Sequence, residues 1–217
     1  DYAISLEKVP NTLNKVYIEN DTIVVNSKNG MNINEEINLK GMHNINNIMF
    51  IYAASNILNL DFDRVLESIK EFKPLEHRME FVAKINGVDY YNDSIATIPA
   101  STMNAVNALK NVNTLIVGGK DRGVNLEELI KFISNNEQIE NVICLPKTGE
   151  FIKAGLEGTL KNVTFVEKLD EAVKHAKKVT KEGTICLLSP AASSYGYFKN
   201  FEERGRLFKK YVLENNE

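Results

Sequence analysis

A glycine-bounded loop carries two basic side chains. Residues 117–123 read Val-Gly-Gly-Lys-Asp-Arg-Gly and include Lys120 and Arg122. Glycine permits positive φ angles and close approach of a ligand to the backbone. The planar guanidinium of Arg122 suits a carboxylate or a phosphate. The loop alone leaves two interpretations open: a cationic clamp on an anion, and a tight turn with a solvated charge pair.

A second loop gathers short polar side chains. Residues 92–97 read Asn-Asp-Ser-Ile-Ala-Thr and place Asp93, Ser94 and Thr97 in one segment. One of the three is expected to cap the helix that follows Pro99. A carboxylate at the end of a strand is also well placed for the ribose hydroxyls of a nucleotide. The residues alone leave both interpretations open.

A third segment combines hydroxyls with aromatic rings. Residues 188–205 contain Ser193 and Ser194, followed by an aromatic run that includes Phe198 and Phe201. Hydroxyls near a helix start, with backbone N–H groups pointing outward, form an anion site. Phe198 is predicted to belong to the core, whereas Phe201 stays open between core and site.

Two shorter motifs precede these loops. Residues 76–81 contain the pair His77 and Arg78 just before a predicted strand. A lone histidine is more often structural than catalytic, and an arginine at a domain boundary indicates an interdomain salt bridge or a nucleotide contact. Residues 41–47 open a helix and include Asn44, for which helix-start chemistry is the simplest interpretation.

Several catalytic signatures do not occur in the 217 residues. There is no phosphate loop of the G-x-x-x-x-G-K-[ST] type, no histidine or cysteine spacing typical of a metal site, and no G-x-S-x-G turn. The sequence therefore predicts neither a complete catalytic site nor a metal site in this chain. The residues alone therefore predict a binding site for a carboxylate or a nucleotide at the ends of strands.

The composition is typical of a globular protein and does not indicate a nucleic-acid-binding or membrane-spanning one. Hydrophobic residues make up 43%, charged residues 25%, and the formal net charge is -3. No basic excess indicates nucleic acid, and no apolar run reaches the roughly 20 residues of a membrane helix.

Cys144 and Cys186 lie in apolar runs, which predicts buried, reduced thiols. Without a signal-peptide pattern the sequence predicts a cytoplasmic protein. Its first residue, Asp rather than Met, indicates a truncated chain.

The first seventy residues are predicted to form strands and then helices. Residues 15–20, 21–27 and 35–40 are rich in β-branched side chains, and Asn-Asp, Asn-Gly and Lys-Gly steps separate them. This stretch is too polar to build a core alone and is typical of a sheet edge whose remainder is missing. A helix from Asn44 carries apolar residues near the helical period at Ile45, Ile48, Met49, Tyr52, Ala53 and Leu58. Asp61 is expected to cap a second helix.

Beyond a boundary near Pro74, strands alternate with helices of about ten residues. Asn86-Gly87 predicts a tight hairpin at the start of this part. The alternation predicts an α/β fold whose mostly parallel sheet is covered by helices on both faces. Ligands of such sheets bind at the carboxyl ends of the strands. The loops at these ends cover residues 93–97, 118–123, 146–149 and 189–201.

Taken together and in order, the five motifs resemble the Mur ligase family, and most of all its D-glutamate-adding members. The matching stretches, which lie within residues 41–210, read GMHN, HRME, NDSIATIP, GGKDRG and LSPAASSYGYFKNFEERG. The resemblance implies a Rossmann-like C-terminal domain over residues 74–217. Residues 1–73 would be the tail of a central ATP-binding domain whose phosphate loop lies outside this chain.

The implied activity is the ATP-dependent addition of D-glutamate to UDP-N-acetylmuramoyl-L-alanine through an acyl phosphate. It would require Mg²⁺ and take place in cytoplasmic peptidoglycan precursor synthesis. The resemblance implies a monomer that binds neither nucleic acid nor membrane. The 217-residue piece alone is expected to be inactive. The alternatives are a related ligase for another amino acid and a non-catalytic module that binds a nucleotide or a dicarboxylate.

The resemblance also assigns roles to residues. The nucleotide would contact Asn44, His77, Arg78 and Asp93. D-glutamate would contact Thr97, Arg122, Ser194 and Phe201. Two positions depart from the family pattern: Ile95 replaces the usual lysine, and residues 192–195 read Ala-Ser-Ser-Tyr where Cys-Ala-Ser is common.

Overall fold

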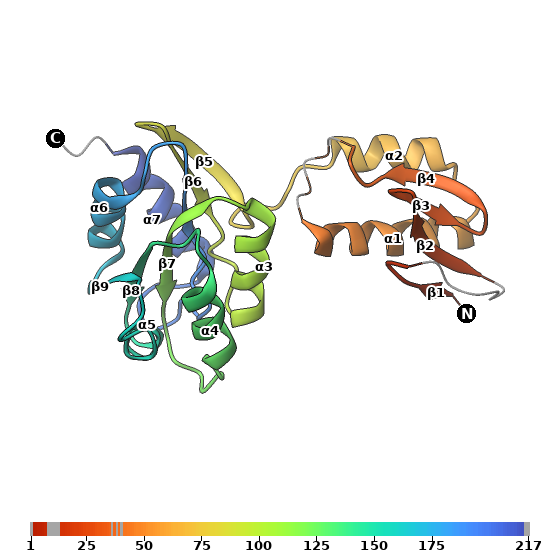
Figure 1. Ribbon diagram of the computed structural model, residues 1–217. Coiled ribbons are helices and arrows are strands. Elements are labelled where there is room, and N and C mark those ends of the chain that lie inside the picture. Colours follow the sequence, from red (N-terminus) through yellow and green to blue (C-terminus); the bar gives the residue numbers. More distant parts are fainter. Residues whose placement is uncertain (1, 8–13, 36, 38, 40, 215–217) are drawn as a thin grey trace. The chain divides into compact units, whose positions relative to one another are not determined.

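The computed structural model describes residues 2–7, 14–35, 37, 39 and 41–214. They form two compact units, Asp1–Pro74 and Leu75–Glu217, each with its own sheet (Figure 1). The division lies beside Pro74, next to the boundary predicted from the sequence. No helix in the described residues is long and apolar enough to cross a membrane.

The first unit packs two helices on a small sheet. The strands are neighbours in chain order: β1 (Ala3–Ile4), β2 (Lys15–Glu19), β3 (Thr22–Val25) and β4 (Lys28–Asn32). The helices are α1 (Met42–Ile57) and α2 (Phe62–Glu71). Asp61 caps α2 as predicted, because its side chain accepts a hydrogen bond of 3.0 Å from the Arg64 N–H.

The two helices supply the apolar side chains that the strands lack. Five of the six predicted positions of α1 are buried, and Tyr52 among them is fully enclosed. Leu58 is wrong as a core position, since it lies beyond the helix end and is 66% exposed. Together with Val16, Ile23 and Val25, the helices form one apolar cluster. The strands therefore have a core here because the helices cover them.

One predicted turn is wrong. Asn20 and Asp21 have positive φ angles and form the expected turn between β2 and β3. The next turn uses Asn26 and Ser27, also at positive φ, and the predicted Asn-Gly step falls inside β4. Gly30 is there for space, because an added Cβ would lie 3.0 Å from the Tyr52 ring. The strand predicted over residues 35–40 is wrong at residues 35, 37 and 39, which lie in no strand, and its other residues are outside the described part; the fourth strand is β4 instead.

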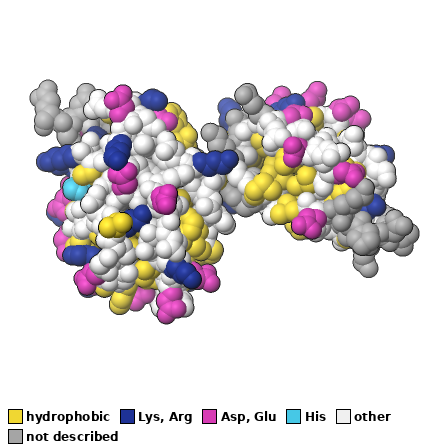
Figure 2. All heavy atoms as spheres, viewed as in Figure 1, with side chains coloured by type: hydrophobic (Ala, Val, Ile, Leu, Met, Phe, Trp, Pro, Cys, Tyr) yellow, Lys and Arg dark blue, Asp and Glu magenta, His cyan; other side chains and the backbone are white. Residues whose placement is uncertain are grey.

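Part of α1 is apolar and exposed. Phe50, Ile51 and Ile57 are each between 43% and 62% exposed. Figure 2 shows hydrophobic side chains gathered on the visible face of this unit, over α1. On the second unit, charges of both signs are interspersed over the face in view.

The second unit is the predicted α/β fold. Its six strands are β5 (Glu80–Ile85), β6 (Val88–Asn92), β7 (Val112–Gly118), β8 (Asn141–Leu145), β9 (Asn162–Phe165) and β10 (Ile185–Leu188). They lie in the order β5-β6-β10-β7-β8-β9, and only the β5–β6 pair is antiparallel. Asn86 and Gly87, at φ 50° and 76°, form the predicted hairpin turn. The mostly parallel sheet is confirmed.

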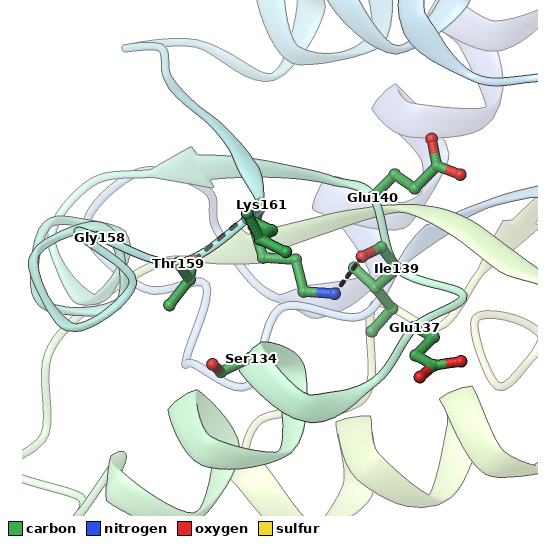
Figure 3. Close-up of a pocket in the computed structure, with 8 residues that line it drawn as sticks. Ser134, Glu137, Ile139, Glu140, Gly158, Thr159 and Lys161 are labelled. Carbon is green, nitrogen blue, oxygen red and sulfur yellow. Dashed lines mark hydrogen bonds between the residues drawn. The ribbon is translucent and has the colours of Figure 1, made fainter.

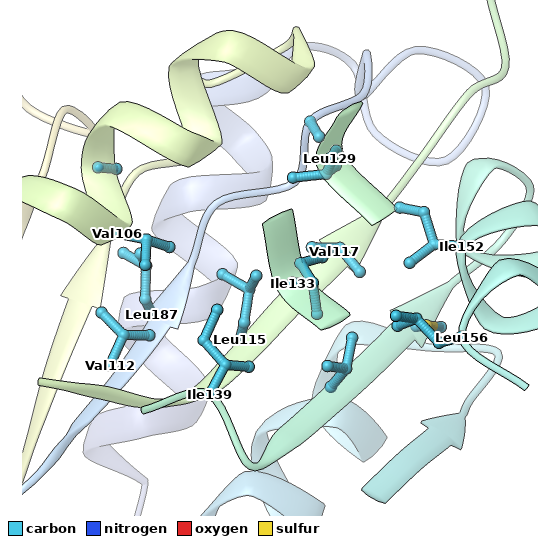
Figure 4. Close-up of a cluster of buried hydrophobic side chains, with 14 of the residues drawn as sticks. Val106, Val112, Leu115, Val117, Leu129, Ile133, Ile139, Ile152, Leu156 and Leu187 are labelled. Atoms are coloured by element: carbon cyan, nitrogen blue, oxygen red, sulfur yellow. The ribbon is translucent and has the colours of Figure 1, made fainter. Parts of the chain in front are cut away.

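Helices cover both faces of this sheet, as predicted. They are α3 (Pro99–Leu109), α4 (Glu127–Asn135), α5 (Thr148–Gly155), α6 (Leu169–Val179) and α7 (Phe201–Leu213). Side chains of α3, α4 and α5 share one buried cluster with Leu115 and Val117 (Figure 4). Side chains of α6 and α7 share the other with Ile116. The alternation along β7 divides the two cores.

The two cysteines follow the same alternation. Cys144 belongs to the α3–α5 face and Cys186 to the α6–α7 face, and both are fully buried and free. Burial raises the pKa of each thiol to about 12. The prediction of buried thiols is confirmed, and both act as small core residues.

The strand order explains why distant motifs meet. Strand β10 lies between β6 and β7, so the connection through α3 crosses over it. The carboxyl ends of β6, β10, β7 and β8 are therefore neighbours at one edge of the sheet. The loops that follow them contain three of the five motifs found in the sequence. Open parallel sheets bind ligands at such a switch point.

Candidate functional site

The segment before β5 is bound to the loop after β6. The Met79 N–H donates to the Asp93 carboxylate at 3.2 Å, and the Ile95 N–H donates to the His77 carbonyl at 3.1 Å. Glu80 adds two contacts, because its carboxylate accepts from the His77 N–H and from the Asn92 side chain. The His-Arg-Met-Glu and Asn-Asp-Ser motifs therefore form one structural unit.

His77 is a packed side chain in this unit. Its ring is 2% exposed, and Asn92 Nδ2 donates to Nδ1 at 2.8 Å, which places the ring proton on Nε2. Gly205 lies against the ring, since an added Cβ would come within 2.2 Å of Nδ1. Burial lowers the pKa of His77, so the ring is neutral near pH 7. Contact with a nucleotide stays a prediction for His77.

Asp93 lies at the end of β6 and is almost fully enclosed. One carboxylate oxygen accepts from Met79 N–H, and the other accepts from the Ser189 hydroxyl at 2.7 Å. Burial raises the pKa of Asp93 to about 6, against the effect of these two bonds and of nearby Arg78. Arg78 itself is exposed. Arg78 is thus near enough to favour the charged form of Asp93, and nucleotide contact stays a prediction for both residues.

A buried arginine connects two site loops to α7. Arg204 is fully buried and donates to three oxygens: Ser94 Oγ at 3.0 Å, the Ser94 carbonyl at 2.7 Å and the Ala192 carbonyl at 3.1 Å. The Ser94 hydroxyl in turn donates to the Phe201 carbonyl at 2.8 Å. No carboxylate in the described residues pairs with Arg204, and burial lowers its pKa to about 9. Its three bonds fix the loops after β6 and β10 relative to each other.

A shallow depression lies above the carboxyl ends of the strands. Thr97 and Arg122, two predicted D-glutamate contacts, both line it, and so does Lys120 from the loop that carries Arg122. With the side chains as they lie, its volume is about 10 Å³, room for about one water molecule. Lys120 and Arg122 are exposed, so their long stems can swing outward for a larger ligand.

The other predicted contacts have different positions. Ser194 is 3% exposed and sits in the loop after β10, next to Ser193, which lines the depression. Phe201 begins α7 and packs edge-to-face on His77, with ring centroids 6.2 Å apart. Asn44 is buried in the first turn of α1, in the other unit. The structure therefore brings Thr97 and Arg122 together and leaves the role of Asn44 a prediction.

A larger depression lies at the opposite edge of the sheet. It has a volume of about 540 Å³ and is lined by residues that include Glu137, Glu140 and Lys161 (Figure 3). The Lys161 ammonium is already used, because it donates to the Asn136 and Ile139 carbonyls at 2.6 and 2.7 Å. Neither its chemistry nor its place at the amino ends of the strands suits an anion. The smaller depression is the better candidate site.

Sequence reasoning missed three side chains of the site. Arg204 and Glu80 stood inside recognised motifs, yet their partners lie up to 129 residues away in the chain. Lys209 pairs with Glu80 at 2.7 Å across the sheet edge. One signal in the sequence could have identified Arg204. It is the fourth residue of the amphipathic helix α7 and lies on the same face as the buried Phe208.

The chain matches known proteins over most of its length. Residues 77–192 match the model of the family described as "Mur ligase, glutamate ligase domain". The chain is 38% identical over 208 residues to the UDP-N-acetylmuramoylalanine--D-glutamate ligase of Thermoanaerobacter sp. (strain X514), covering 93% of this chain and 45% of that protein. The Caldicellulosiruptor bescii protein of the same name is 36% identical, with 93% and 44% covered. The chain thus spans about 45% of the length of these relatives.

Solved structures agree at the level of the fold. The UDP-N-acetylmuramate-alanine ligase of Thermotoga maritima superposes with a TM-score of 0.66 at 19% identity, over 93% of this chain and 46% of that one. The folylpolyglutamate synthase of the same organism gives 0.53 at 20% identity, over 82% and 44%. The family model covers more than half of the 217 residues. The chain therefore belongs to the Mur ligase family.

Proposed function

We propose that the full-length protein adds D-glutamate to UDP-N-acetylmuramoyl-L-alanine with hydrolysis of ATP to ADP and phosphate. The observation that carries this is the depression at the switch point, where Arg122 and Thr97 meet the loop of Ser194. A guanidinium beside hydroxyls suits a dicarboxylate. The names of the similar proteins supply the rest of the substrate assignment.

The proposed reaction has two steps. The carboxylate of UDP-N-acetylmuramoyl-L-alanine attacks the γ-phosphorus of ATP, which gives an acyl phosphate and ADP. The amine of D-glutamate then attacks the acyl carbon, an amide bond forms, and phosphate leaves with the bonding electrons. Chemistry of this kind depends on positioning and on charge stabilisation. This chain would contribute the positioning of D-glutamate through Arg122, Thr97, Ser194 and Phe201.

The chain fits only part of the ATP and Mg²⁺ requirement. Arg78 and Asp93 are the proposed contacts of the ribose region, although both Asp93 oxygens already accept hydrogen bonds. The 217 residues contain no phosphate loop. In the described part of the chain no three acidic, histidine or cysteine side chains are grouped to hold a metal. The 217-residue chain alone should therefore show no turnover. The full-length protein is proposed to act as a cytoplasmic monomer.

The test is ADP release by the full-length gene product given ATP, Mg²⁺ and UDP-N-acetylmuramoyl-L-alanine. D-glutamate, L-lysine and diaminopimelate are added one at a time. Release that requires D-glutamate is the expected result, and Arg122→Gln should raise the KM for D-glutamate at least about tenfold. Release with another amino acid would move the chain to a related ligase. Binding without release, for every amino acid, would leave a non-catalytic module.

A further inference from the structure

The loop after β7 presents two cations to the depression. Lys120 and Arg122 both line it, together with Thr97, Thr148 and Ser193. The Lys120 N–H donates to the Ser193 carbonyl at 2.8 Å, so the backbone at Lys120 is fixed against the loop after β10. The contact is close, because a Cβ at Gly119 would lie 2.4 Å from the same carbonyl oxygen. The base of the Lys120 side chain is therefore held at the rim while its ammonium is free to move.

Both cations are available to a ligand. Within the described residues neither Lys120 nor Arg122 takes part in an ion pair. Asp121 lies between them, and its carboxylate accepts from the Gly123 N–H at 2.8 Å, which turns one oxygen back onto the loop. The lining thus carries two positive charges and one negative charge, with a net attraction for an anion.

The facing loop, residues 92–97, offers no cation. Ile95 is half-buried and its N–H is used by the His77 carbonyl. Asp93 is enclosed and its oxygens are occupied. Thr97 is the one residue of this loop that lines the depression. Of the two loops that face each other across the depression, only the loop after β7 therefore offers cations, and it offers two.

We infer that Lys120 determines specificity for a dicarboxylate, since it and Arg122 each hold one carboxylate of the amino acid. The inference rests on the proposed function. A guanidinium binds one carboxylate with two parallel hydrogen bonds, and an ammonium on a flexible stem binds the other as a point charge. Lys120 thereby supplies the positive charge that Ile95 does not. A monoamide of D-glutamate loses one of these two contacts.

The test uses the full-length enzyme and three variants. Lys120→Met removes the charge, Lys120→Arg keeps it, and Lys131→Met removes an exposed lysine on α4 as a matched control. The KM for D-glutamate should rise at least about tenfold in Lys120→Met, with the KM for ATP within about twofold. Lys120→Arg and Lys131→Met should stay within about threefold of wild type.

Inhibition by D-glutamine and by D-isoglutamine then shows which of the two carboxylates of D-glutamate Lys120 binds. Wild type should bind both monoamides more weakly than D-glutamate, and Lys120→Met should lose that preference against one of them. An unchanged KM in Lys120→Met, or an equal loss in Lys120→Arg, would overturn the inference. Equal weakening of D-glutamate and both monoamides would overturn it as well. Absence of D-glutamate-dependent release by wild type would instead refute the proposed function.

Discussion

In the larger sheet, buried polar groups lie at both ends of the parallel strands. We call the end where these strands begin the amino edge and the end where they finish the carboxyl edge. The two edges contain different kinds of polar group. At the amino edge the groups are neutral: Asn141 Nδ2 donates to Asn113 Oδ1 at 3.1 Å, and Thr180 Oγ1 donates to Thr114 Oγ1 at 2.8 Å. At the carboxyl edge they include the buried ionisable groups Asp93, His77 and Arg204, beside the half-buried ion pair of Glu80 and Lys209.

The difference separates structural polarity from site polarity. Neutral amides and hydroxyls satisfy one another at modest cost, whereas a buried charge is expensive unless it is well compensated. Arg204 is compensated by neutral oxygens alone, and His77 Nε2 has no hydrogen-bond partner. Perturbed ionisable groups of this kind cluster at functional sites, which favours the carboxyl edge as the binding site.

The largest expected effect is the loss of the Arg204 clamp. Arg204→Met leaves two carbonyls and a hydroxyl without their donor, so the free energy of unfolding should fall by about 4 kcal/mol. Urea unfolding of the 217-residue chain, followed by circular dichroism, measures it. The matched control at the amino edge is Lys161→Met. Lys161 donates to two carbonyls but is half-exposed, so water can replace it and the loss should be about 1 kcal/mol. Equal losses of unfolding free energy in Arg204→Met and Lys161→Met would contradict the expected difference between the two edges.

Asp93 should give the carboxyl edge a pH dependence. Burial raises its pKa from 3.8 to about 6, so the folded state holds the proton more tightly than the unfolded chain. Stability should therefore fall as pH rises from about 4 through about 6, by about 3 kcal/mol at full ionisation. Asp93→Asn keeps an acceptor for Met79 and should remove this component from urea unfolding measured across the window. A constant difference between Asp93→Asn and wild type at every pH would contradict the assignment.

The fold could be predicted because periodicity is local. The alternation of buried strands such as β7 with amphipathic helices fixed the α/β class, and Asn86-Gly87 fixed the hairpin. The turn at Asn29-Gly30 could not be predicted correctly. A glycine needed for space against Tyr52, 22 residues away, reads the same as a glycine needed for a turn.

The site could be predicted only in part, for a related reason. Each loop was visible as a motif, and the switch-point rule gathered Thr97 and Arg122 at one edge. The partners of Arg204 and Glu80 depend on β10 inserting between β6 and β7. Spacing along a chain carries no information on that order, so the buried charge network appeared only in three dimensions.

Gly205 should tolerate no side chain while His77 occupies its place. An alanine Cβ would lie 2.2 Å from His77 Nδ1, which is full atomic overlap, so Gly205→Ala should cost about 2 kcal/mol. The cause can be isolated by a double-mutant cycle with His77→Ala. In that background the cost of Gly205→Ala should fall below about 0.5 kcal/mol. An unchanged cost would place the strain in the helix and not in the ring contact.

The smallest effect compares one buried hydroxyl from each edge. Thr180→Val keeps its shape and loses two hydrogen bonds among neutral groups, so it should cost about 1 kcal/mol and leave D-glutamate-dependent ADP release by the full-length protein unchanged. Ser94→Ala loses one bond to Phe201 and one acceptor for Arg204. Its stability cost should be of similar size, about 1 to 2 kcal/mol.

These two variants should then differ in activity rather than in stability. Ser94 links the loop of Thr97 to the start of α7, so Ser94→Ala displaces groups proposed to hold D-glutamate, and the KM for D-glutamate should rise about threefold or more. Steady-state kinetics of both variants, set beside their urea unfolding, makes the comparison. If Thr180→Val impaired D-glutamate binding as much as Ser94→Ala at equal stability loss, the carboxyl edge would have no special role. Its charged side chains would then have the same purely structural role as the neutral side chains at the amino edge.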